Sequence, residues 1–237
     1  MKVFDETIRK MEALLGNYSA RLLPPLEGYP TEKEKVFLFP EDAYCSLGGR
    51  NVPSSYSFSY TSDPALVAKE QSYLIGKDLP ELSGEVPFVH AVMLRLSENE
   101  KNDQELYGMF RRIEYTRYSL FPAGYMVKVN TNQLKEGALV GFEAKEKGLN
   151  FAALASLFAS SFRKEKSIVA VKQYFVTDPS FPYGEFASLA SSSERIIVTL
   201  DHIMKKLVMD CSSCEFKGVC DEIEGMRELH KKEEGKR

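Results

Sequence analysis

The chain has few cysteines, no tryptophan, no long apolar run and no excess of charge of either sign. It has 4 cysteines in 237 residues and a formal net charge of −3. This balance gives no indication of nucleic acid or an anionic membrane as a partner. No stretch approaches the roughly 20 apolar residues that span a bilayer, so we expect no membrane partner either.

The first residues also lack the features of a secretory signal. The segment MKVFDETIRKMEALL alternates charged and apolar residues at helical spacing and contains no continuous apolar core. We therefore expect a cytoplasmic protein. Four cysteines in a reducing compartment are more typical of free thiols or metal ligands than of a disulfide framework.

The apolar content of 43% is sufficient for a folded core. The order of the expected elements predicts an α+β fold with α/β-like alternation: a mixed sheet of about four to six strands with helices packed on it, and a long helix that leads to a cysteine loop. We expect helices at 3–23, 64–75, 102–121, 149–162 and 183–209, and strands at 36–40, 56–60, 87–97, 124–130 and 167–176.

Changes in composition divide the chain into three segments. Residues 1–63 are expected to form a helix followed by a loop-rich part that carries Cys45, because five prolines and a Gly-Gly pair lie in 24–63. Residues 64–210 are expected to form the main α/β core. Residues 211–237 hold a cysteine motif, a short helix and a charged tail.

Three of the four cysteines lie in CSSCEFKGVC, residues 211–220, with the spacing C-x2-C-x5-C. Two cysteines separated by two residues can turn both sulfurs toward one metal, and a cysteine at the start of a following helix is favoured as a thiolate. The residues between them are mostly polar, which indicates ligation rather than burial of free thiols.

The number of ligands favours an iron–sulfur cluster. A structural zinc site usually adds a second cysteine or histidine pair, which this motif lacks, although zinc remains the alternative. Three local cysteines and one distant cysteine suit a [4Fe–4S] cluster bound by Cys45, Cys211, Cys214 and Cys220. His230 is the competing fourth ligand, but ten helical residues would place it roughly 15 Å from Cys220.

No catalytic residue is identified, and whether the protein is an enzyme stays open. The sequence has no G-x-S-x-G, no H-E-x-x-H and no P-loop. His90, in an apolar strand, and His202 are expected to be structural. Arg111, Arg112 and Arg117 form a basic helix edge, which is typical of a solvated face.

The cysteine spacing, with one cysteine about 165 residues upstream, resembles the iron–sulfur staple of RecB-like nucleases of the Cas4 and AddB type. In that group the cluster ties the two ends of the domain together. The group also requires an Asp and a Glu-x-Lys or Asp-x-Lys on adjacent strands. In VAVKQYFVTD the lysine has no carboxylate two residues before it, so a nuclease is the alternative rather than the leading interpretation.

A longer resemblance covers about 100 of the 237 residues. It is carried, in order, by GKDLPELSGEVPF (76–88), FRRIEY (110–115), AGYMVKVNTNQLKEG (123–137) and LNFAALASLFASSFRKEKSIVAVKQYFVTD (149–178). These stretches are similar to the C-terminal, A-cluster-bearing region of acetyl-CoA synthase, the beta subunit of the carbon monoxide dehydrogenase/acetyl-CoA synthase complex of anaerobes. In that family a C-x2-C pair begins the cluster ligands shortly after the last strand, and Cys211 and Cys214 occupy a comparable place.

The resemblance also implies what this chain lacks. The family binds its distal nickel through a Cys-Gly-Cys, which is absent here, so we expect no carbonyl insertion or thioester formation. We expect an iron–sulfur protein whose cluster is structural or transfers electrons. Its expected partner is a redox protein or a one-carbon/carbon monoxide dehydrogenase-type complex.

Overall fold

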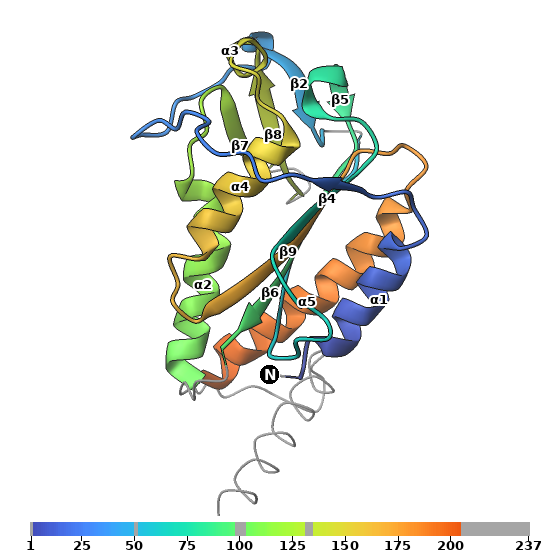
Figure 1. Ribbon diagram of the computed structural model, residues 1–237, viewed down its shortest axis with the longest axis vertical. Helices are drawn as coiled ribbons and strands as arrows, with labels where there is room; N and C mark the ends of the chain where they lie inside the picture. Colours follow the sequence, from blue (N-terminus) through green and yellow to red (C-terminus); the bar gives the residue numbers. More distant parts are fainter. Residues whose placement is uncertain (1, 50–51, 98–102, 131–134, 205–237) are drawn as a thin grey trace, which may run out of the picture.

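The computed structural model describes residues 2–49, 52–97, 103–130 and 135–204, which form two sheets and their covering helices (Figure 1). The larger sheet has the strand order β1-β4-β9-β6-β3 and the smaller one β5-β2-β8-β7. The strands are β1 (Arg21–Leu23), β2 (Ala43–Leu47), β3 (Ser54–Thr61), β4 (Gln71–Ile75), β5 (Gly84–Val86), β6 (Phe88–Leu96), β7 (Tyr125–Asn130), β8 (Lys135–Gly141) and β9 (Ile168–Val176). The α-helices are α1 (Asp5–Leu15), α2 (Asp103–Ser119), α3 (Phe142–Glu146), α4 (Phe151–Phe162) and α5 (Tyr183–Met204).

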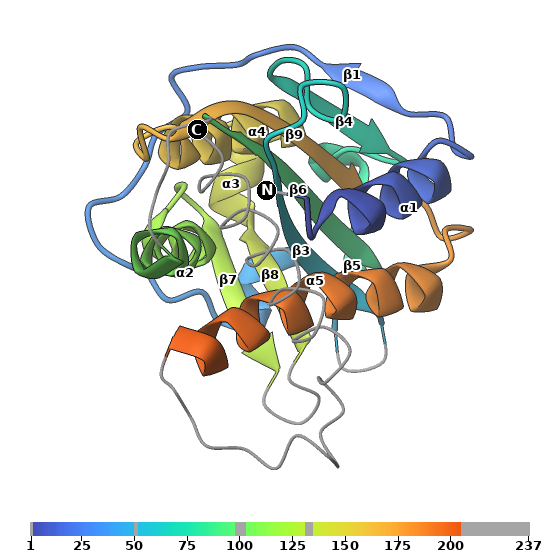
Figure 2. The ribbon, with the colours of Figure 1, turned by 90° about the horizontal axis from the view of Figure 1, so that it is seen from below.

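The larger sheet is mixed, and the expected α+β fold is confirmed. β9 pairs in parallel with β4 and antiparallel with β6, and β3 pairs in parallel with β6 at the edge. Both central strands are nearly continuous apolar runs, as strands buried on two faces require. Helix α4 covers one face of this sheet, and α1 and α5 cover the other (Figures 1 and 2).

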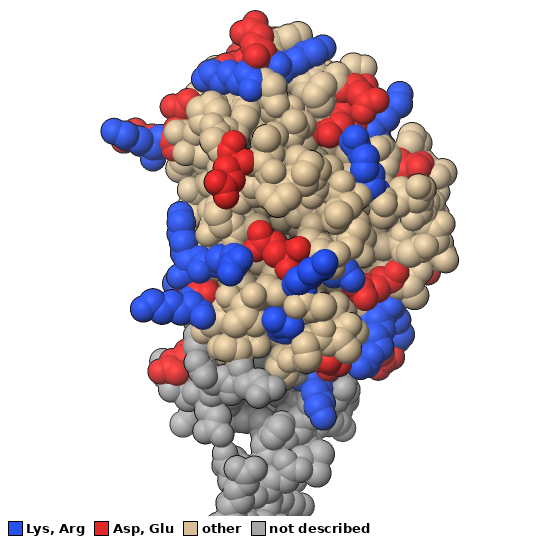
Figure 3. Space-filling view, viewed as in Figure 1, with Lys and Arg blue, Asp and Glu red and all other residues tan. Residues whose placement is uncertain are grey.

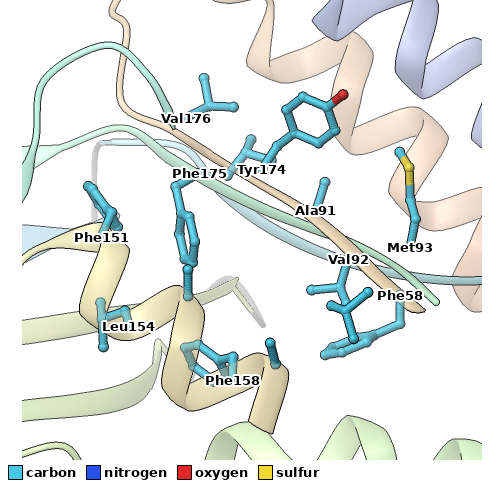
Figure 4. Packing of buried hydrophobic residues seen from close by; sticks show 14 of the residues in the cluster. Phe58, Ala91, Val92, Met93, Phe151, Leu154, Phe158, Tyr174, Phe175 and Val176 are labelled. Atoms are coloured by element: carbon cyan, nitrogen blue, oxygen red, sulfur yellow. The ribbon is translucent and has the colours of Figure 1, made fainter. Parts of the chain in front are cut away.

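Side chains that alternate along the strands divide the core between the two faces. In Figure 4, Phe175 points toward Phe151 and Phe158 of α4, while Tyr174 and Met93 point to the opposite face. The Phe151 and Phe175 rings lie 4.9 Å apart. Each such fully buried side chain contributes roughly 1.5–3 kcal/mol relative to an exposed one. The sheet and α4 therefore form one continuous apolar core.

One expected helix, at 64–75, is wrong. Asp63 does accept a hydrogen bond from the Ala65 backbone N–H, as an N-cap would, but only a turn follows. Residues Gln71–Ile75 instead form β4, which pairs with β1 on one side and β9 on the other. The backbone hydrogen bonds and burial supplied by two neighbouring strands outweigh a short helical pattern.

Three further expectations at the amino-terminal end are corrected. The first helix ends at Leu15, with Gly16 as its C-cap, and Arg21–Leu23 form an edge strand. Residues 36–39 form no strand, and Phe37 is 70% exposed. The part expected to be loop-rich, residues 24–63, contributes β2 to the smaller sheet and β3 to the larger one.

His90 is a buried structural residue, as its place in an apolar strand predicts. Its side chain is 1% exposed and its ring stacks on Phe175 with the centroids 4.4 Å apart. The amide of Gln173 donates hydrogen bonds to Ala155 O and Ser72 Oγ, so its oxygen is the acceptor that faces His90 Nε2 at 3.0 Å. His90 Nε2 therefore carries a proton, and because burial lowers the pKa of the ring to about 4, His90 is neutral at pH 7.

The neutral His90 makes the protein sensitive to acid. Burial lowers the pKa of His90 from 6.5 to about 4. Between these values the unfolded chain binds a proton that the native state does not, so the free energy of unfolding is expected to fall by about 3 kcal/mol as the pH decreases from 6.5 to 4. Urea unfolding across this range measures the loss. His90→Gln should flatten the profile, and an equally steep profile in that variant would contradict the assignment.

Among the residues with assigned positions, no helix combines the length and apolar character needed to cross a membrane.

Candidate functional site

Cys45, the distant cysteine of the expected ligand set, lies on a strand and not in a loop. It is on β2, opposite Gly84 of β5 and Val140 of β8, and is 1% exposed within the core. Burial raises the pKa of Cys45 to about 12, although nearby Lys128 acts in the opposite direction. Without a metal, Cys45 is therefore a protonated thiol at neutral pH.

The other expected ligands, Cys211, Cys214 and Cys220, lie outside the described residues, as does His230. Helix α5 begins near β5, where the Tyr183 hydroxyl donates a hydrogen bond to Pro87 O, and runs away from β2 (Figure 1). The seven residues from Met204 to Cys211 span at most about 25 Å. To share a cluster with Cys45, the chain after α5 would have to turn back toward β2.

Within the described ranges no three His, Cys, Asp or Glu side chains are grouped as metal ligands. Charges are mixed on the face shown in Figure 3, where lysines and arginines alternate with acidic residues. This face therefore has no broad area of one sign.

A second site is a cleft of about 530 Å³ between α2, α5 and the start of β3. Residues 54–58 of β3 form its floor. Its walls are side chains from the last turns of α2 and the middle of α5, together with Glu136 of β8. Helices α2 and α5 pack against each other, and α5 also packs against β3. The volume is in the range of small-ligand and peptide-binding pockets.

Arg117 is the central charge of this cleft, and the expectation of a solvated helix edge is wrong for it. Its side chain is only 14% exposed and forms an ion pair with Glu136 Oε1 at 2.6 Å. Its guanidinium lies 4.9–5.3 Å from the ring centres of Tyr56, Phe58 and Tyr118. Burial by itself lowers the pKa of Arg117, but Glu136 and Tyr118 outweigh it and raise the pKa. Arg117 therefore stays charged.

The Arg117–Glu136 pair joins the end of α2 to the start of β8. Glu136 Oε1 also accepts a hydrogen bond from the Tyr118 hydroxyl, and its backbone carbonyl accepts one from Ser54 Oγ. Arg117 Nε and Glu136 Oε2 are buried and have no hydrogen-bond partner among the described residues. These contacts hold the end of α2, the start of β3 and the start of β8 together.

The position of Arg117 could have been found from helical spacing. It follows Phe110 by seven residues and Ile113 by four, so it lies on the inward face that these two buried residues define. Arg111 and Arg112, one to two residues before Ile113, do remain exposed and pair with Glu114 and Glu165.

Comparison of the chain with models of known protein families and with curated protein sequences finds no match.

Proposed function

We propose that this protein binds one [4Fe–4S] cluster through Cys45, Cys211, Cys214 and Cys220. The observation that carries the proposal is the C-x2-C-x5-C spacing in a polar segment. Cys45 is the fourth ligand in this proposal because it is the one remaining cysteine of the chain. Its high pKa does not oppose ligation, because a coordinating metal deprotonates a thiol outright.

Four thiolates would leave no iron open to a substrate, so the cluster is structural or transfers electrons. The similarity to the acetyl-CoA synthase C-terminal region, without its nickel ligands, favours a redox protein or a carbon monoxide dehydrogenase-type complex as the partner. We place the protein in the cytoplasm, where thiols stay reduced.

Spectroscopy of cysteine variants tests this function. Anaerobically purified protein is expected to be brown, to bleach on reduction with dithionite and to give an electron paramagnetic resonance signal of a reduced cluster. Cys214→Ser should abolish or greatly weaken this signal, while Ser213→Ala, in the same loop, should leave it intact. An unchanged spectrum in Cys214→Ser, or a colourless parent protein, would contradict the assignment.

A further inference from the structure

The floor of the cleft is a strand edge without a described partner. β3 lies at the end of the larger sheet and pairs only with β6 among the assigned strands. Along a parallel pair, successive residues direct their peptide groups alternately toward and away from the partner. Pro53 O accepts a hydrogen bond from Phe88 N. The peptide groups of Ser55 and Ser57 therefore also point toward β6, and those of Tyr56 and Phe58 point outward.

The wall opposite this edge leaves room for a second backbone. α5 lines the cleft with Ala187, Ala190 and Ser191, whose side chains are small. The lining of α5 extends to Val198, a length of about 17 Å. The five β3 residues of the floor, from Ser54 to Phe58, span about 13 Å, somewhat less than the α5 lining. The cleft therefore matches one extended segment of about five residues.

The charges at the cleft favour a basic side chain on that segment. Both arginines of the lining already have partners, since Arg111 pairs with Glu114 and Arg117 with Glu136. Burial raises the pKa of Glu114, Arg111 and Arg117 lower it, and Glu194 lies close enough to raise it slightly further. No residue of the described part forms an ion pair with Glu194. The lining thus holds one carboxylate more than its arginines neutralise.

We propose that this cleft binds an extended peptide segment of a partner protein. The segment adds to the outward edge of β3, which no described strand pairs with, hydrogen bonds to the peptide groups of Tyr56 and Phe58, and places a lysine or arginine at Glu194. This interaction is separate from the cluster proposed above and does not depend on it.

A labelled synthetic peptide, Thr-Val-Thr-Lys-Thr-Val-Thr, tests the proposal on the full chain. Fluorescence anisotropy should show saturable binding, and hydrogen exchange of the outward amides of Tyr56 and Phe58 should slow when the peptide is present. A peptide with Glu in place of Lys should bind about tenfold more weakly, and Glu194→Gln should remove that preference.

Two neighbouring residues of α5 provide matched variants. Ala187→Leu fills the cleft and should weaken binding about tenfold or more, whereas Ser188→Leu lies outside the lining and should leave binding unchanged. Absence of binding at millimolar peptide overturns the proposal, as does equal binding by both variants. Slow exchange of the outward amides of Tyr56 and Phe58 without peptide, unaffected by its addition, would show that the chain itself covers this edge and would also overturn it.

Discussion

Cys45→Ala is expected to leave at most a three-iron cluster and to lower the free energy of unfolding of the cluster-bound protein by roughly 4–5 kcal/mol beyond the packing cost of the substitution itself. The reason is loop closure. A cluster that links Cys45 to Cys211 closes a loop of about 166 residues, which removes conformational entropy from the unfolded chain as a long disulfide loop does. Iron analysis and chemical denaturation under anaerobic conditions measure both effects.

The cluster-free proteins provide the control. Cys45 is buried on β2, so its truncation also costs core packing, on the order of 1–2 kcal/mol, with or without a cluster. The parent and Cys45→Ala should therefore differ by only this amount after the metal is removed. Full iron content in Cys45→Ala, with the same small loss in both forms, would show that another group is the fourth ligand, such as water or Glu222.

Arg117→Ala is expected to destabilise the protein by about 3–5 kcal/mol. The substitution leaves Glu136 as a largely buried carboxylate without its cation, and it also removes the guanidinium from between three aromatic rings. Urea denaturation at neutral pH measures the change in the free energy of unfolding.

Arg112→Ala is the matched control on the same helix. Its side chain is 60% exposed and pairs with Glu165 at the surface, so its loss should cost no more than about 1 kcal/mol. The double variant Arg117→Met, Glu136→Leu removes both charges and should recover much of the stability lost in Arg117→Ala. Equal effects of Arg117→Ala and Arg112→Ala would contradict a structural role for the buried pair.

The elements predicted best are those whose sequence pattern and tertiary environment agree. Phe88–Leu96 and Ile168–Val176 are long apolar runs, and both are central strands of the larger sheet. Phe151–Phe162 has a strong apolar helical pattern and an Asn150 N-cap, and it is a helix. At residues 36–40 the apolar run VFLF suggested a strand, but no described strand pairs with it and Phe37 remains exposed.

The candidate sites, too, were predictable only where the signal lies within one short segment of sequence. Cysteine spacing is a local signal, so the sequence could specify three ligands from one short segment. It could not show that Cys45 lies between β5 and β8, because that pairing joins residues far apart in the chain. The cleft was missed for the same reason. Its floor, walls and buried ion pair come from β3, α2, α5 and β8, and only the inward spacing of Arg117 is visible in the sequence.

The proposed cluster is tested most directly by measuring iron and acid-labile sulfide in anaerobically purified full-length protein. The predicted result is about four irons and four sulfides per chain, because four thiolates match one cubane cluster. A colourless protein with one zinc per chain and no sulfide would contradict the cluster and identify the cysteine motif as a zinc site.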